Sequence, residues 1–149
     1  MNEDYHDILV ALAACGARFL VVGAHALAVH GYPRATVDID IWIEPTPDNA
    51  RRVWKALAQF GAPLHELGIR ESDFCRQDVV AQFGLPPNRI DILTGVSGTT
   101  FERAWEGRIE SDLEGVRAPV IGLRDLRENK AASGRDKDRA DLKGLEGKS

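Results

Sequence analysis

The sequence contains little cysteine and no long apolar run. Cys15 and Cys75 are its only cysteines, too few for a disulfide scaffold and too far apart for a zinc site, so we expect a reducing, cytoplasmic compartment. Its start is acidic and polar, so we expect no signal peptide. The most apolar stretch, residues 19–29, is well short of the ~20 residues that a membrane-spanning helix needs, so we expect no membrane contact.

The sequence also lacks an excess of positive charge. Its 19 lysines and arginines are outnumbered by 23 aspartates and glutamates, which gives a formal net charge of −4. Dedicated nucleic-acid-binding proteins normally carry a strongly basic face, so this class is disfavoured, although the composition is compatible with a local basic cleft. The 149 residues are 44% hydrophobic, which is enough to bury the core of one domain over residues 1–149.

Apolar residues at helical spacing alternate along the chain with short apolar runs that are typical of buried strands. The predicted helices cover residues 3–15, 24–30, 47–60, 99–105 and a C-terminal segment of about 123–149. The predicted strands cover residues 18–22, 37–43, 89–93 and a hairpin within 108–122. Thr99 and Glu102 are predicted to form a capping box. This order predicts an α/β (α+β) fold with a small mixed β-sheet and flanking helices.

Two aspartates lie in a run that is otherwise apolar. Asp38 and Asp40 are separated by one residue in a strand whose other face carries Val37, Ile39 and Ile41, so both carboxylates project from one face of the strand. Either this is the solvent-exposed face of an amphipathic strand, or a cation between the carboxylates offsets their repulsion. Mg²⁺ is suited to the second role because it prefers oxygen ligands.

A third aspartate favours the metal-binding interpretation. Asp91 lies in another short apolar strand, at 89–93, although aspartate is disfavoured in strands. If the two strands pair in the right register, the carboxylates of Asp38, Asp40 and Asp91 converge on one point. Three converging carboxylates are the protein half of a two-metal site, in which two Mg²⁺ ions hold the attacking and leaving oxygens of a displacement.

A glycine turn precedes the acidic pair. Gly23 and Ala24 follow the predicted strand at 18–22 and precede a short helix. Such a turn lets backbone N–H groups approach a phosphate. Many strand-to-helix turns use glycine for structural reasons alone, so the turn by itself leaves both interpretations open.

The ordered set of these motifs resembles the nucleotidyltransferase superfamily related to DNA polymerase β. The finer pattern is similar to that of small bacterial members, which include minimal nucleotidyltransferases and abortive-infection toxins of toxin–antitoxin systems. The resemblance covers residues 18–145. The segments that carry it are Gly23-Ala24, Asp38-Ile39-Asp40-Ile41, Arg89-Ile90-Asp91-Ile92 and residues 31–40, 86–94 and 130–142.

The resemblance implies transfer of a nucleoside monophosphate from an NTP to an acceptor, with release of pyrophosphate. It implies that Asp38 and Asp40 hold both metal ions, and that Asp91 binds the catalytic metal and helps to activate the acceptor hydroxyl. The turn at Gly23 is expected to bind the β- and γ-phosphates. The family usually has Gly-Ser or Gly-Gly at this turn, whereas this chain has Ala24, so a serine contact to phosphate is lost and backbone contacts remain.

Residues close to the acidic pair are further candidates for nucleotide binding. Arg34 and Thr36 precede the pair at the same two-residue spacing. Arg34 either neutralises phosphate or forms a salt bridge with Asp38 or Asp40. Trp42, on the acid-bearing side of the strand, is a candidate for stacking on a base.

The C-terminal segment supplies a second set of candidates. Lys130 and Asp138 are expected, by the resemblance, at the triphosphate or in organising the site. Arg135 and Lys137 are expected to contact phosphate. The alternative is a solvated helix face, because basic and acidic residues alternate here.

The sequence supports two hypotheses of different classes. The first is a Mg²⁺-dependent nucleotidyltransferase that takes an NTP and an RNA or protein acceptor, as part of a toxin–antitoxin system. The second is a weakly active or inactive nucleotidyltransferase-like module that acts through a partner protein, as an antitoxin or as a binding module. The presence of all three aspartates favours the enzyme. The short chain leaves little room for an acceptor-binding domain, which a cognate partner or a homodimer could supply.

Overall fold

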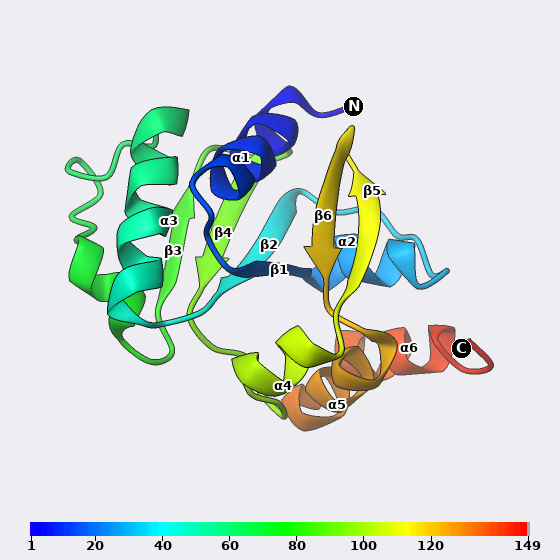
Figure 1. The fold of residues 1–149 in the computed structure, drawn as a ribbon. Coiled ribbons are helices and arrows are strands. Elements are labelled where there is room, and N and C mark those ends of the chain that lie inside the picture. The colour runs from blue at the N-terminus through cyan, green and yellow to red at the C-terminus, as the bar shows by residue number, and fades with distance from the viewer. Residues whose placement is uncertain (149) are drawn as a thin grey trace.

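A mixed six-stranded sheet forms the centre of the computed structural model, which describes residues 1–148 (Figure 1). Its strands are β1 (Phe19–Val22), β2 (Asp38–Ile43), β3 (Val80–Phe83), β4 (Arg89–Leu93), β5 (Ile109–Leu113) and β6 (Val116–Val120). Their order in the sheet is β3-β4-β2-β1-β6-β5. β2 pairs in parallel with β4, and β1 pairs in parallel with β6, whereas the other neighbours are antiparallel.

Helices cover the sheet on more than one side. They are α1 (Glu3–Ala14), α2 (Gly23–Val29), α3 (Pro47–Phe60), α4 (Phe101–Glu106), α5 (Leu123–Ser133) and α6 (Asp136–Gly144), with a 3₁₀ turn at Glu71–Cys75. Figure 1 shows α1 and α3 together on one side of the sheet, and α4, α5 and α6 gathered at the lower end of the view. No helix within residues 1–148 is long and apolar enough to cross a membrane. The predicted α/β (α+β) class with a mixed sheet is confirmed.

Helix α3 illustrates how local sequence sets the elements. Its N-cap is Thr46, whose side chain accepts a hydrogen bond from the Asn49 N–H, and Pro47 begins the helix, where a missing N–H is harmless. Gly61 ends it in the left-handed conformation, with φ of 94°. The buried apolar stripe consists of Ala50, Val53, Ala56 and Leu57.

The predicted capping box of Thr99 and Glu102 is wrong. Thr100 is the N-cap of α4, and its side chain accepts a hydrogen bond from the Arg103 N–H. The hydroxyl of Thr99 instead donates to Oδ1 of Asp125 at 2.8 Å. Asp125 is buried, and a buried carboxylate needs donors, so a contact distant in sequence decides the role of Thr99.

The C-terminal segment predicted to be helical from about 123 to 149 consists of α5 and α6. Gly134 separates the two helices, with φ of 64°. Ser149, the last residue of that prediction, lies outside the described residues.

The parallel pairing of β2 and β4 positions the aspartates. In this register Asp38 lies opposite Arg89, and Asp40 lies opposite Asp91. The intervening residues of both strands are isoleucines that are almost fully buried. A slip by one residue would bring the acids into the core, so the apolar face fixes the register that the site requires.

Candidate active site

The carboxylates of Asp38, Asp40 and Asp91 converge, as the sequence predicted for a suitable register. One oxygen of each lies within 4.8 Å of the others. All three side chains line a pocket of about 670 Å³. Three oxygen donors at this separation suit a hard divalent cation.

Asp40 carries the least compensated charge of the three aspartates. Burial raises the pKa of Asp40 from 3.8 to about 7, and the negative charges of Asp38 and Asp91 add to the effect, whereas the charge of Lys137 lowers it. The ionised form of Asp40 is therefore costly in the protein without a cation. A bound divalent cation would offset this cost, so the donor set fits such an ion.

Gly23 allows the start of α2 to approach Asp40. Its φ is +67°, and a Cβ atom at this position would lie 2.1 Å from Oδ2 of Asp40. Glycine is therefore required both by the backbone conformation and by the close approach. Ala24 follows in α2, and both residues line the pocket beside the aspartates.

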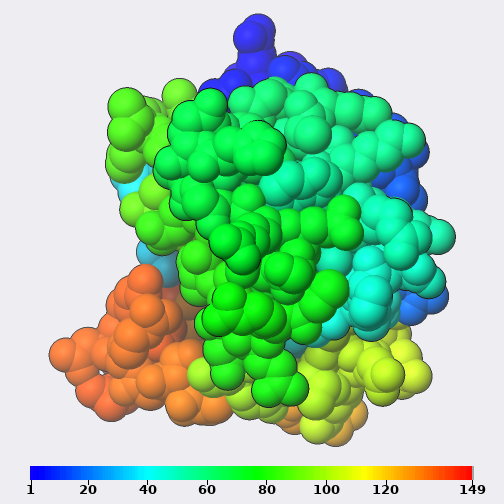
Figure 2. Space-filling view, turned by 90° about the vertical axis from the view of Figure 1, so that its left-hand side faces the viewer, coloured from blue at the N-terminus to red at the C-terminus, as the bar shows by residue number. Residues whose placement is uncertain are grey.

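The pocket combines an acidic floor with a basic wall. The floor is formed by β2 and β4, and the wall by the loop before β2 together with α5 and α6. Figure 2 shows cyan atoms of the segment leading into β2, recessed between the light green β3–β4 hairpin and the orange C-terminal helices. The basic residues of the wall are Arg34, Lys130, Arg135 and Lys137.

Lys130 is buried in an ion-pair network. Its Nζ lies 3.1 Å from Asp141 Oδ2 and 3.4 Å from Asp138 Oδ1, and its side chain is 6% exposed. Asp138 is itself fully buried and does not line the pocket, whereas its partners Lys130 and Arg135 do. Burial alone raises the pKa of Asp138, but the hydrogen bond from Arg135 and the charge of Lys130 lower it overall.

Arg34 joins the same network from the loop before β2. Its guanidinium contacts Asp141 through Nε, 3.1 Å from Oδ1, and Nη2, 3.3 Å from Oδ2. The alternative of a salt bridge to Asp38 or Asp40 is therefore wrong. Asp141, which sequence reasoning missed, ties this loop and α5 to α6.

This network predicts a structural role for Lys130. Lys130→Met removes the cation between two buried carboxylates, and we expect a loss of about 3 kcal/mol in the free energy of unfolding. Urea denaturation measures the change. Wild-type stability in the variant would contradict the assigned role.

Lys137 differs from the other cations of the wall. It lines the pocket and acts on Asp40 through its charge. Among residues 1–148, no carboxylate lies within ion-pair distance of it. Its ammonium group is therefore available to an anionic ligand.

The remaining candidates near the acids have structural contacts. The hydroxyl of Thr36 donates to Oδ1 of Asp38 at 3.2 Å and so orients that carboxylate. Trp42 is 2% exposed and packs edge-to-face on Phe101 with ring centroids 5.3 Å apart. The idea that Trp42 stacks on a base is wrong, because α4 covers its ring.

Arg89 is the main functional candidate that sequence reasoning missed. Its guanidinium hydrogen-bonds to Asp38 and Asp91, and these contacts raise the pKa of Arg89, mainly through the hydrogen bond to Asp91. The available signal was the spacing of Arg89 and Asp91, which places both side chains on the same face of one strand.

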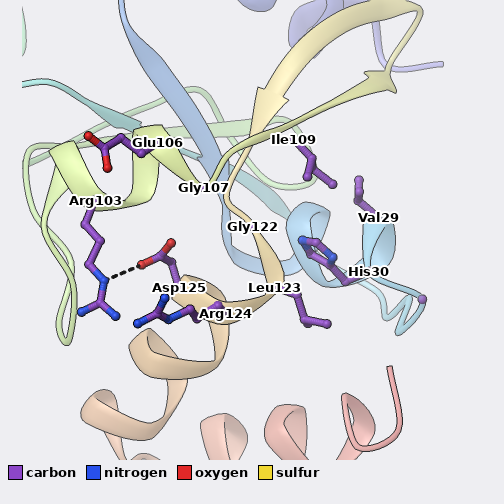
Figure 3. Close-up of a pocket in the computed structure, with 11 residues that line it drawn as sticks. Val29, His30, Arg103, Glu106, Gly107, Ile109, Gly122, Leu123, Arg124 and Asp125 are labelled. Carbon is purple, nitrogen blue, oxygen red and sulfur yellow. Dashed lines mark ion pairs between the residues drawn. The ribbon is translucent and has the colours of Figure 1, made fainter. Parts of the chain in front are cut away.

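A pocket of about 980 Å³, larger than the one that the aspartates line, lies apart from the acids (Figure 3). It is lined by the end of α2, by α4 and by the start of α5, and it contains the Arg103–Asp125 ion pair, with a distance of 3.9 Å. None of the three converging aspartates lines it. Size alone therefore does not identify the site, and the chemistry favours the smaller pocket.

The fold is shared with solved nucleotidyltransferase structures. A protein of Thermotoga maritima, assigned as a nucleotidyltransferase, matches with a TM-score of 0.63 over 93% of this chain and 88% of its own, at 14% identity. The lincosamide antibiotic adenylyltransferase LnuA, with lincomycin bound, matches with a TM-score of 0.58 over 99% and 97%, at 13% identity. No protein-family model and no curated protein sequence matches the chain. The chain thus has the nucleotidyltransferase fold, which confirms the sequence resemblance at the level of fold.

Proposed function

We propose that this chain is a metal-dependent nucleotidyltransferase that moves a nucleoside monophosphate from an NTP to a hydroxyl group of RNA or protein. The observation that carries the proposal is the convergence of Asp38, Asp40 and Asp91 in a pocket with a basic wall. The fold supports it, because two solved structures of the same fold are assigned to nucleotidyl or adenylyl transfer.

The proposed reaction makes one bond and breaks one. The acceptor oxygen bonds to the α-phosphorus of the NTP, the bond from that phosphorus to the β-phosphate breaks, and pyrophosphate leaves. Asp91 takes the proton of the attacking hydroxyl. Asp38, Asp40 and Asp91 would hold Mg²⁺, which when bound would supply positive charge against the charge that develops on the phosphate oxygens.

The basic wall binds the triphosphate in this proposal. Arg135 and Lys137 contact phosphate oxygens, whereas Lys130 and Asp138 fix α5 against α6. Gly23 and Ala24 border the phosphates without a side-chain hydroxyl. Positioning and charge compensation account for catalysis, as in other phosphoryl transfers.

Lys137→Met tests the assigned wall. Loss of one charge-assisted contact is worth about 1.5 kcal/mol, so we expect the KM for NTP to rise about tenfold. The free energy of unfolding should stay within about 0.5 kcal/mol of the wild-type value, because the lysine has no partner in the described chain. A large loss of stability with unchanged KM would contradict this assignment, because Lys137 would then have the structural role that is assigned to Lys130.

The acceptor is proposed to be macromolecular, within a toxin–antitoxin pair. A partner protein or a second copy of the chain is proposed to complete the acceptor site. LnuA is named for an antibiotic acceptor, so a small molecule is the competing class that an experiment has to separate.

Label transfer tests the proposed function. The protein is incubated with Mg²⁺, each α-labelled NTP and a cell lysate, and the Asp38→Asn/Asp40→Asn double variant serves as the control. We expect label in material that is destroyed by ribonuclease or by protease. Label that resists both treatments would point to a small-molecule acceptor, and an equal signal in the control would refute the enzymatic proposal.

Ala24 favours a second candidate function, a weakly active or inactive module that binds a partner protein. The family usually has serine or glycine at this position, and a methyl group cannot donate a hydrogen bond to phosphate. Calorimetric binding of NTP and Mg²⁺ without any label transfer would favour this second function over the first.

A further inference from the structure

The positively charged guanidinium of Arg89 lies among the three aspartates. Arg89 Nη2 donates to Asp38 Oδ2 at 2.6 Å, and Arg89 Nε donates to Asp91 Oδ1 at 3.0 Å. Nη2 also lies 3.3 Å from Asp91 Oδ2. The guanidinium therefore bridges two of the three carboxylates.

The sheet register builds this bridge. Arg89 lies opposite Asp38 on the neighbouring strand, and it precedes Asp91 by two positions on its own strand. The Arg89 side chain is 30% exposed, against 18% for Asp38 and 8% for Asp91, so the contacts are partly shielded from water. A planar guanidinium in a fork geometry makes stronger contacts than a point charge does.

Arg89 divides the carboxylate oxygens into two groups. Both oxygens of Asp91 and Oδ2 of Asp38 accept hydrogen bonds from Arg89. Oδ1 of Asp38 accepts only from the Thr36 hydroxyl among the described residues. Asp40 receives no hydrogen bond from Arg89. The Asp38–Asp40 side of the cluster is therefore open to a cation, whereas Asp91 is occupied.

We propose that Arg89 is a positioning residue that withholds Asp91 from metal until a nucleotide binds. The proposal rests on the proposed function, because it concerns the same metal site. In the free protein, Asp38 and Asp40 hold one divalent ion. Arg89 releases Asp91 when the triphosphate provides a new partner for its guanidinium, and the second ion is then taken up.

Phosphate oxygens can replace the carboxylate of Asp91 as hydrogen-bond acceptors for the Arg89 guanidinium. Arginine stays protonated at all relevant pH values, and phosphate and carboxylate oxygens both match its donor geometry. Release from Asp91 without phosphate would leave the Arg89 guanidinium with fewer partners. It would leave Asp91, which is largely buried, with only the Gln82 side-chain amide, whose Nε2 lies 3.4 Å from Oδ2. Nucleotide therefore acts as the condition for assembling the complete metal site, which limits metal loading of the free protein.

The test counts Mn²⁺ ions bound per chain by electron paramagnetic resonance, with and without a non-hydrolysable NTP analogue. For the wild type we expect one ion without the analogue and two with it. For Arg89→Gln we expect two ions without the analogue, the second bound at least about tenfold more tightly than in the wild type. Arg76→Gln, which removes an exposed ion pair to Asp73 of 3.0 Å, is the matched control and should behave as the wild type.

Arg89→Lys keeps the result interpretable if Arg89→Gln does not fold. Lysine retains the charge without the fork, so its second-ion affinity should lie between those of the wild type and Arg89→Gln. Equal ion counts and affinities in wild type and both variants, with two ions bound in the presence of the analogue, would overturn this inference alone. Absence of Mn²⁺ binding in every protein, even with the analogue, would overturn the proposed function as well.

Discussion

Asp40→Asn is expected to abolish nucleotidyl transfer and, at the same time, to stabilise the metal-free protein at pH 8. Loss of a metal-holding carboxylate should reduce the transfer rate by at least about 10³-fold, which corresponds to several kcal/mol of transition-state stabilisation. The gain in stability follows from the pKa of Asp40, which burial and the neighbouring carboxylates raise from 3.8 to about 7.

The size of the gain in stability depends on pH. Between pH 3.8 and about 7 the unfolded chain loses the proton of Asp40 while the folded protein keeps it, so the stability of the metal-free wild type falls as pH rises through this range. Above pH 7 the folded state carries the full cost of the ionised carboxylate. Asparagine removes this cost, so we expect a gain of about 4 kcal/mol at pH 8 and almost none at pH 4.

Urea denaturation at the two pH values, in the presence of a chelator, measures this effect. Asp112→Asn is a suitable control, because that carboxylate is 81% exposed and pairs only loosely with Arg117, at 3.7 Å. It should alter neither activity nor the pH dependence of stability. A gain of equal size at pH 4 and pH 8 for Asp40→Asn would contradict the account, as would retained transfer.

Gly23→Ala is expected to reduce transfer by about 10²-fold or more, although it adds only one methyl group. The methyl carbon would lie 2.1 Å from Oδ2 of Asp40, so either Asp40 or the start of α2 has to move. Displacement of a reacting group by about 1 Å is enough for a loss of this size. A steady-state transfer assay with saturating Mg²⁺ measures the effect.

Gly61→Ala separates the clash from backbone strain. Gly61 also has a positive φ, of +94°, but nothing lies within 4 Å of a Cβ atom built there. Alanine should therefore cost about 1 kcal/mol of stability at either position through the left-handed backbone, whereas only Gly23→Ala should impair transfer. Equal activities of the two variants would show that the approach of Gly23 to Asp40 has no catalytic importance.

The acidic floor of the site could be predicted from the sequence because it depends on local patterns. Alternation along residues 37–43 assigns Asp38 and Asp40 to one face, and Asp91 stands alone in a short apolar strand. The convergence of the three carboxylates also depends on the register in which β2 and β4 pair, which the sequence leaves open. The buried isoleucines that oppose each other in β2 and β4 provide this register.

The basic wall could be predicted only in part, because its contacts are distant in sequence. Lys130 and Lys137 are both candidates for the triphosphate site in the sequence, yet the first is enclosed by Asp138 and Asp141 and the second is open to the pocket. Arg34 meets Asp141 across more than a hundred residues. Only the packing of α6 against α5 and against the loop before β2 distinguishes these roles.

Two features escaped prediction for other reasons. β3 has four residues with alternating exposed and buried positions, which is too short a pattern to separate from a loop. Arg89 lies inside a recognisable motif, but its function depends on the carboxylate opposite it on the neighbouring strand. Pairing between strands, rather than the pattern within one strand, creates that contact.

The most direct test of the central claim is the location of bound metal in a crystal grown with Mn²⁺ and a non-hydrolysable NTP analogue. Anomalous diffraction locates Mn²⁺ independently of the surrounding protein. We expect two anomalous peaks within coordination distance of Asp38, Asp40 and Asp91, with the triphosphate against Lys137. Metal bound elsewhere, or nucleotide bound in a pocket without these three aspartates, would contradict it.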